Sequence, residues 1–438
     1  MNPKALIGPM LAALLALSAT AAQAHGKVLR LSPNGTNDTQ QLQNALSACA
    51  GVREPCQILL TKGVFHTDVL LVRDFNGRIR GQGQGNTIIR PLSHAPLRST
   101  ARPFLKDPTR AEPYPVLLHF ADGGDVELTD LTLEFPEDMQ VAPWGLPDGL
   151  PNKLYAGILV DGGRDDAARL SLARLAIIAP RSPTFGSNVY NAVRFEGQNR
   201  ATDAYDAIGR ATPLARGEMT AHDVSINGSY VGFAVHDVNR SQVELVDNDI
   251  QDVLTSCIQL ADLSQSYATV RDNRVAVASQ GIGITRGSRL TGGVEQFSKK
   301  ASTYLISHNT LNVETGDGIA VIDSLRFFGL PGGGIDTVVL RDNDVVLDPG
   351  AIEAVAVIGD DGHVTVANND LWGPSAFGGI YVDEARGTRV RSNVFHGFAP
   401  AAPDVTLTPG TSECWIYEPT ATVLDDGVDN HVKAASGN

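Results

Sequence analysis

LVDNDI at residues 245–250 decides the fold of this chain, because the same short pattern returns at five later places. The pattern is an apolar residue, two others, Asn, one other and a second apolar residue. Its further copies are VRDNRV at 270–275, ISHNTL at 306–311, LRDNDV at 340–345, VANNDL at 366–371 and VRSNVF at 390–395. Such recurrence predicts a repeat architecture.

A second short strand is associated with these repeats. The strands are GFAV at 232, CIQL at 257, GIGI at 281, GIAV at 318, AVAV at 354 and GIYV at 379, at intervals of 25, 24, 37, 36 and 25 residues. A unit this short lacks the helix of a leucine-rich repeat and the length of a propeller blade. It predicts an all-β fold, a right-handed single-stranded parallel β-helix whose coils stack about 4.8 Å apart.

The six recurring Asn residues have a structural interpretation. We expect each to lie at a bend with left-handed backbone angles, which Asn tolerates better than most residues. Stacking of the coils lets each amide hydrogen-bond to the Asn above and below. The pattern extends backwards to LTDLTL at 128–133, LARLAI at 172–177 and AHDVSI at 221–226. Residues 57–398 should therefore form roughly 10–12 stacked coils.

The N-terminal region divides into two segments. Residues 1–24 are expected to be a secretory signal, with Lys4, an Ala/Leu-rich run and a small-residue cleavage site at 22–24. Residues 25–56 should carry a helix over 37–50, with Asn37 or Asp38 as N-cap, that covers the open end of the β-helix. Residues 399–438 lose the repeat and are interpreted as a C-terminal tail or cap.

The four cysteines and the net charge limit the classes of protein to which this chain can belong. Cys49 and Cys56 are seven residues apart and should form a disulfide in an oxidising compartment, while Cys257 and Cys414 should be free. A net charge of −14 argues against a nucleic-acid partner. No second apolar span follows the signal. We expect a secreted or periplasmic monomer.

Long segments flank one of the expected sheets from both sides. Segments at about 134–156 and 178–191 precede two strands, and segments at about 196–218, 286–302 and 323–336 follow others. Loops of this kind would wall a groove along that sheet. Small outward residues, Ala234, Gly283 and Ala320, would leave room there for an extended polymer.

Alternation along these strands selects the candidate catalytic residues. Asp161, Arg194, Glu196, His236 and Gln259 should point outward, with Asp161, Glu196 and His236 in a column about 5 Å apart. Two carboxylates this close repel, so one should have a raised pKa suited to glycoside cleavage. Arg194 could instead neutralise a uronate while His236 abstracts the adjacent proton. The alternative is a solvated face on which Arg194 only pairs with Glu196. The catalytic candidates are Arg194, Glu196, His236 and Asp161.

The segment 286–302 is locally basic. It carries Arg286, Arg289, Lys299 and Lys300 against Glu295, four positive charges against one negative, in an otherwise acidic chain. A basic loop beside a groove attracts an anionic saccharide. The substrate-binding candidates are Gln259, Thr285, Arg286 and Arg289.

The motifs resemble a known superfamily. TNDTQQLQNALSAC at 36–49 and GRIRGQGQGNTII at 77–89 resemble the N-terminal coils of the pectate-lyase-like superfamily. The six Asn repeats resemble parallel β-helix repeats of secreted bacterial proteins. This resemblance spans about residues 34–398 and implies a fold that hosts lyases, hydrolases, epimerases, adhesins and tailspikes. TGDGIAV at 315–321 resembles the TGDDCIAV-type element of polygalacturonases, with Gly318 in place of the second acid, so Asp317 is interpreted as a turn residue.

These observations predict a function and an alternative to it. We expect a β-helix protein that binds an extended, anionic polysaccharide and cleaves it as a lyase or a glycoside hydrolase. The alternative is a non-catalytic binding or structural protein of the cell envelope or surface. No cofactor is expected, although acidic turns such as Asp360-Asp361 offer a calcium site as an alternative to solvated loops.

Overall fold

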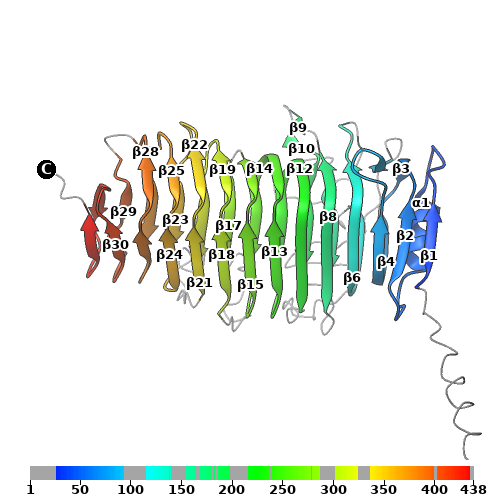
Figure 1. Cartoon of the computed structure of the whole chain (residues 1–438), viewed down its shortest axis with the longest axis horizontal. Helices are drawn as coiled ribbons and strands as arrows, with labels where there is room; N and C mark the ends of the chain where they lie inside the picture. Colours follow the sequence, from blue (N-terminus) through cyan, green and yellow to red (C-terminus); the bar gives the residue numbers. More distant parts are fainter. Residues whose placement is uncertain are drawn as a thin grey trace, which may run out of the picture.

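The computed structural model shows a stack of parallel coils that form a right-handed β-helix (Figure 1). The structure describes residues 26–92, 115–137, 139, 154–162, 167–179, 181–182, 186–197, 216–236, 238–277, 279–286, 301–323, 336–375, 377–398 and 402–434. The predicted signal at 1–24 lies outside these residues. Within them, no helix has the length and apolar character that a membrane crossing needs.

Sheet 1 is the sheet that the sequence predicted to be flanked by long segments. Its strands pair in parallel with the equivalent strands of neighbouring coils. Those confined to it are β7 (Leu154–Asp161), β11 (Val189–Glu196), β17 (Gln280–Arg286), β20 (Ile319–Asp323), β23 (Val355–Ile358), β26 (Ile380–Asp383), β29 (Val405–Leu407) and β31 (Val423–Asp425).

Sheet 2 precedes the Asn bends and sheet 3 follows them. Sheet 2 contains β1 (Val28–Leu31), β2 (Cys56–Leu60), β13 (Gln242–Val246), β15 (Tyr267–Arg271), β18 (Thr303–Ser307), β21 (Thr337–Arg341), β24 (His363–Ala367), β27 (Arg389–Arg391), β30 (Trp415–Glu418) and β32 (His431–Ala434). Sheet 3 contains β3 (Gly63–Thr67), β5 (Thr87–Pro91), β16 (Arg274–Val277), β19 (Thr310–Val313), β22 (Asp344–Leu347), β25 (Asp370–Trp372) and β28 (Val394–His396).

Five long strands bend and run from one sheet into the next. Their pairings change partner along their length, which joins the three sheets into one wall. They are β4 (Leu70–Arg80), β6 (Val116–Glu134), β8 (Ala168–Ile178), β12 (Gly217–His236) and β14 (Asp249–Ala261). The two-residue strands β9 (Arg181–Ser182) and β10 (Gly186–Ser187) form a separate antiparallel pair.

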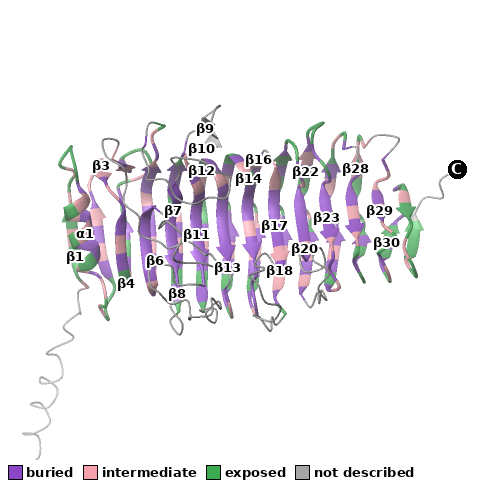
Figure 2. Cartoon of the chain, turned by 180° about the vertical axis from the view of Figure 1, so that it is seen from behind, coloured by how far each residue is buried: buried purple, intermediate pink, exposed green. Residues whose placement is uncertain are grey.

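The core lies inside the coil and consists of apolar side chains stacked in rows. One row of sheet 1 runs through Ile158, Val193, Phe233, Ile258 and Ile282, all fully buried and in register. Figure 2 shows these strands side by side and mostly buried. Removing a large member of such a row leaves a cavity, and Phe→Ala changes of this kind cost about 3–5 kcal/mol. The inner face therefore fixes which side chains sheet 1 presents outward.

The Asn ladder predicted from the repeat is confirmed. The side-chain Nδ2 of each of the first five Asn donates to the Oδ1 of the next at 2.8–3.0 Å. The six are buried. The backbone prediction was wrong by one position, because the left-handed residue precedes each Asn, as at Asp272 (φ 59°) and Asp342 (φ 56°). The ladder consists of Asn248, Asn273, Asn309, Asn343, Asn369 and Asn393.

The N-terminal end is covered by helix α1 (Thr39–Ser47). Its Leu42, Ala45 and Leu46 are buried, as the amphipathic pattern predicted. Gln43 donates to the carbonyl of Leu71 at 2.7 Å and accepts from its N–H at 3.3 Å, so one side chain satisfies an edge residue of β4. The helix thus protects an exposed strand edge from pairing elsewhere.

The cysteines in the N-terminal cap differ in bonding state from those in the later coils. A disulfide joins Cys49, just after α1, to Cys56 at the start of β2. Cys257 and Cys414 are free and buried. The disulfide ties the helical cap to the sheet beneath it.

The β-helix continues beyond Phe398, where the sequence was interpreted as a tail or cap. Strand β29 pairs with β26, and β30 pairs with both β27 and β32. The Asn pattern disappears in this region because a carboxylate replaces the next amide. Asn393 Nδ2 donates to Glu418 Oε1 at 2.7 Å, and its backbone N–H donates to the same carboxylate. Glu418 therefore ends the ladder, and the stacking extends to β32.

Candidate functional site

The outer face of sheet 1 brings the predicted catalytic residues together. Parallel registers place Glu196 opposite Asp161 on one side and opposite His236 on the other. Arg194 lies two residues before Glu196 and is opposite Leu159 and Ala234. The side chains come from β7, β11 and β12, and all four polar residues are buried. An outward face of a sheet normally meets water, whereas these four side chains are buried. Their hydrogen-bond and charge partners within the protein therefore determine what they can do.

Arg194 and Glu196 form a forked ion pair within one strand. Arg194 Nε donates to Glu196 Oε2 at 3.0 Å and Nη2 donates to Oε1 at 3.3 Å. The guanidinium also lies over the ring of Tyr155, 5.3 Å from its centroid. The side chains are 8% and 0% exposed. Charge and geometry are thus satisfied within the protein, and the guanidinium is not available to a substrate carboxylate in this conformation.

Asp161 is held by a histidine that the sequence analysis did not identify. His119 Nε2 and Asp161 Oδ2 lie 2.9 Å apart, and both side chains are fully buried. Within the part of the chain that the structure describes, the other ring nitrogen, His119 Nδ1, has no hydrogen-bond partner. His119 is in register with Leu159, and Leu159 is in register with Arg194, so His119 lies two coils before Arg194. A ring oriented by a carboxylate, with one nitrogen unused, has the arrangement of a general base.

His236 and the predicted substrate-binding residues continue along the same face. His236 Nε2 lies 2.9 Å from Oε1 of the half-buried Gln259. His236, Ala261 and Thr285 form one row across successive coils, with Thr285 one coil beyond Ala261. The expected open space at Gly283 is absent, because a side chain there would collide with Gln280. Arg289 lies outside the described residues, so its role stays a prediction.

Arg286 is buried in an acidic cluster. It forms an ion pair with Asp336, and it lies opposite Asp323 in the next coil. Asp360 lines the same small cavity, and burial raises its pKa to about 6. Arg286 was predicted to bind substrate; its carboxylate partner within the protein gives it a structural role, and substrate contact stays a prediction.

A pair of carboxyl groups lies further along sheet 1. Asp317 and Glu353 each lie two residues before an equivalent strand, β20 and β23, which begin at Ile319 and Val355. The N–H of Gly318 donates to the carbonyl of Glu353 at 2.9 Å, which places the two acids in neighbouring coils. Each side chain shifts the pKa of the other through a side-chain interaction. Glu353 is buried and Asp317 half-buried. We call Asp317 and Glu353 the acid pair.

The acid pair has the strongly perturbed titration that an acid–base site needs. Burial, then the hydrogen bond and the charge of Asp317, raise the pKa of Glu353 from 4.5 to about 8. Burial also raises the pKa of Asp317, against the opposing effect of its bond to Glu353. The charge of Glu353 contributes to a raised pKa of Tyr381, on the next strand of sheet 1. At neutral pH the pair therefore holds one proton close to the outer face.

The sequence pattern predicts a turn residue at Asp317 and gives no role to Glu353. The signal was present, because GIAV at 318 and AVAV at 354 were aligned as equivalent strands and an acid precedes each. Of the described residues, none form a group of three or more His, Cys, Asp or Glu that could hold a metal ion. The site thus consists of a histidine–carboxylate–arginine group and, three coils away, the acid pair.

Comparisons with known proteins assign the fold. No family model and no curated protein matches the sequence. The structure is similar to a GH136 lacto-N-biosidase from Eubacterium ramulus, with 13% identity, TM-score 0.52 and coverage of 93% of this chain and 68% of that one. It also aligns with an Erwinia carotovora polygalacturonase, with 12% identity, TM-score 0.49 and coverage of 88% of this chain and 96% of that one. A third alignment is with the A-module of the Azotobacter vinelandii mannuronan C-5 epimerase AlgE4, with 13% identity, TM-score 0.44 and coverage of 92% of this chain and 94% of that one. The chain has the pectin-lyase-like parallel β-helix fold.

Proposed function

We propose that this protein binds an extended, acidic polysaccharide along the outer face of sheet 1 and hydrolyses its glycosidic bonds at the acid pair. The observation that carries the proposal is the placement of Asp317 beside the buried Glu353 in neighbouring coils, with the pKa of Glu353 raised to about 8. Most glycoside hydrolases use two carboxyl groups in different protonation states. The similarity to a lacto-N-biosidase is in keeping with action on a saccharide.

The proposed reaction assigns different roles to the two carboxyl groups. Glu353 gives its proton to the departing glycosidic oxygen as the bond from that oxygen to the anomeric carbon breaks. Asp317 stays ionised and stabilises the positive charge that develops on the sugar ring. Water then forms the new bond to the anomeric carbon, and its released proton restores Glu353. General acid catalysis of this kind typically contributes about 10²–10⁴-fold to the rate.

Elimination at the His119–Asp161–Arg194–Glu196–His236 group is the second candidate. Among the described residues His119 Nδ1 has no hydrogen-bond partner, and this favours elimination, since a ring held by Asp161 could abstract a proton next to a uronate carboxylate. The fork between Arg194 and Glu196 weighs against it, because the substrate carboxylate would have to displace Glu196. The catalytic assignment of Asp161, Arg194, Glu196 and His236 therefore becomes testable against that of the acid pair.

One assay separates the two reactions and the non-catalytic alternative. Purified protein is incubated with plant and algal polysaccharides while absorbance at 235 nm and new reducing ends are followed together. Hydrolysis gives reducing ends without absorbance, and Glu353→Gln should lower its rate at least 100-fold with the fold retained by circular dichroism. Absorbance that His119→Ala abolishes and Glu353→Gln spares would refute the hydrolytic proposal. Binding without either product would identify a binding protein of the cell envelope.

The proposal also covers where in or outside the cell the protein acts. We propose that the protein acts outside the cytoplasm, in the periplasm or in the medium, as a monomer. The signal-like residues 1–24 and the disulfide between Cys49 and Cys56 both favour an oxidising compartment. Fractionation of cells that express the full chain, with mass spectrometry of the mature N-terminus, tests this.

A further inference from the structure

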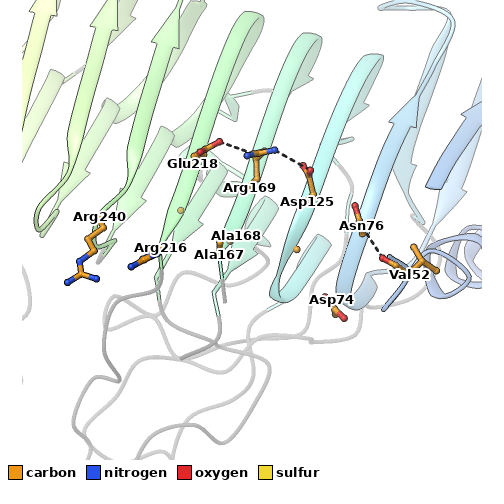
Figure 3. A pocket seen from close by; sticks show the side chains of 12 residues that line it. Val52, Asp74, Asn76, Asp125, Ala167, Ala168, Arg169, Arg216, Glu218 and Arg240 are labelled. Carbon is orange, nitrogen blue, oxygen red and sulfur yellow. Dashed lines mark hydrogen bonds and ion pairs between the residues drawn. The ribbon is translucent and has the colours of Figure 1, made fainter. Parts of the chain in front are cut away.

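A cavity of about 480 Å³ lies on sheet 2, away from the acid pair. It extends across neighbouring coils, from Asp74 and Asn76 at the bend of β4 to Arg240 just before β13 (Figure 3). This volume falls in the range of small-molecule sites. Its lining includes three arginines and three acids, and their pairing decides what could bind: Asp74, Asp125, Arg169, Arg216, Glu218 and Arg240.

Three of these charges are already paired and form one wall. Arg169 Nε donates to Glu218 Oε2 at 2.8 Å, and Nη1 lies 3.4 Å from Asp125 Oδ2. The hydrogen bond to Glu218, more than any other contact, raises the pKa of Arg169. Figure 3 shows the three side chains in a row across neighbouring strands. This row is neutralised apart from one excess negative charge, so it shapes the wall and does not attract an anion.

Arg216 and Arg240 differ from Arg169, because no carboxylate of the described residues pairs with them. Glu218 pairs with Gln242, so the residues two positions earlier, Arg216 and Arg240, occupy equivalent places in neighbouring coils. Arg240 Nε donates to the neutral side chain of Gln265 at 3.1 Å. Among the described residues, neither arginine forms an ion pair with an acid, and Arg216 has no side-chain hydrogen bond at all.

Two unneutralised arginines in neighbouring coils are unfavourable for folding alone. Coils are about 4.8 Å apart, so Arg216, just before β12, and Arg240, in the bend before β13, hold two exposed like charges at equivalent places in neighbouring coils. The chain is strongly acidic, with 49 acidic residues against 35 basic ones, yet none of the acids that the structure describes pairs with either arginine. An anion between the two guanidiniums would remove the repulsion and accept forked hydrogen bonds.

We infer that this cavity is a second saccharide site, which binds an acidic sugar of the polymer through a carboxylate held between Arg216 and Arg240. The identity of the ligand as a saccharide rests on the proposed function; its negative charge follows from the arginines. The small residues Ala167, Ala168 and Gly217 form the adjoining lining, where a sugar ring can lie close to the backbone. Asp74 and Asn76 at the other end offer side-chain oxygens as acceptors for hydroxyl groups, since the Asn76 amide nitrogen already donates to the carbonyls of Val52 and Arg53.

The test uses the full chain carrying Glu353→Gln, which prevents turnover by the proposed mechanism. Isothermal titration with a galacturonate hexamer and with a mannuronate hexamer should show an event that Arg216→Ala/Arg240→Ala weakens at least tenfold. Arg216→Lys/Arg240→Lys should be intermediate, because Lys keeps the charge and loses the fork. Arg271→Ala/Arg386→Ala removes two surface arginines that are paired elsewhere and serves as the matched control.

Other outcomes overturn the inference. Binding of both hexamers unchanged by Arg216→Ala/Arg240→Ala refutes the site, and so does equal binding of neutral maltohexaose there. Inorganic sulfate that binds as tightly as either hexamer would show a simple anion site and also refute a saccharide site. Cleavage by the otherwise unmodified chain is measured separately. If no polysaccharide is cleaved but the arginine-dependent binding persists, the proposed function fails and this inference stands.

Discussion

The two ends of the candidate site on sheet 1 bury charge in opposite ways. Around β11, Glu196 meets Arg194 and Asp161 meets His119, so each carboxylate has a basic partner. Around β20 and β23, Asp317 meets Glu353, another acid. Balanced pairs hold a shape without storing a proton, whereas two acids in contact must share one. The same fold therefore offers a rigid polar group at one place and a proton donor at another.

The largest effect should come from breaking the balanced end. Arg194→Ala leaves the buried carboxylate of Glu196 without its partner, and removal of one member of a buried pair costs about 3–5 kcal/mol. Thermal unfolding of the variant measures the loss. The double change Arg194→Met/Glu196→Leu removes both charges and should recover most of the stability. If Arg194→Ala alone unfolds like the parent, the fork contributes nothing to folding.

Breaking a buried polar network that carries no charge should have an intermediate effect on stability. Asn309 is buried and its amide joins Asn273 to Asn343. Asn309→Leu removes these bonds and leaves neighbouring polar groups unpaired, at a cost of about 1–3 kcal/mol. Denaturant unfolding gives the value. An unchanged midpoint would show that the ladder does not stabilise the stack.

The acid pair should show itself in the pH dependence of stability. The pKa of Glu353 is raised from 4.5 to about 8, so the folded state binds the proton more tightly than the unfolded chain. Its contribution is fully present below about pH 4.5 and is lost as pH rises towards 8. Glu353→Gln keeps a donor to Asp317 and removes the titration. The difference in melting temperature between variant and parent should grow in favour of the variant across this window. Parallel curves would contradict the raised pKa.

An exposed ion pair sets the lower limit of the comparison. Arg386 and Glu413 are 57% and 54% exposed, so water already solvates both charges. Arg386→Ala should leave the midpoint of unfolding close to that of the parent, because exposed ion pairs contribute little to stability. A loss as large as that of Arg194→Ala would mean that burial does not control the difference between the two ends.

The coil from Asn248 onward was predictable, because one residue type marks each bend and the inward side chains alternate regularly. The column of Asp161, Glu196 and His236 followed from the same alternation. His119 was missed because its strand at 116–121 had not been assigned to a coil. The acid pair was missed because its members lie 36 residues apart, and only stacking brings them into contact. The continuation past Phe398 was missed because Glu418 replaces an Asn.

The Asn ladder also separates loop length from coil geometry. Consecutive members are 25, 36, 34, 26 and 24 residues apart in sequence, yet the bond between them stays within 2.8–3.0 Å. Extra residues are therefore accommodated outside the bend, and the next coil begins in the same phase whatever precedes it. In evolutionary terms the ladder confers tolerance to insertions. Segments beside sheet 1 can lengthen, shorten and diversify while the strands that present the candidate site keep their positions.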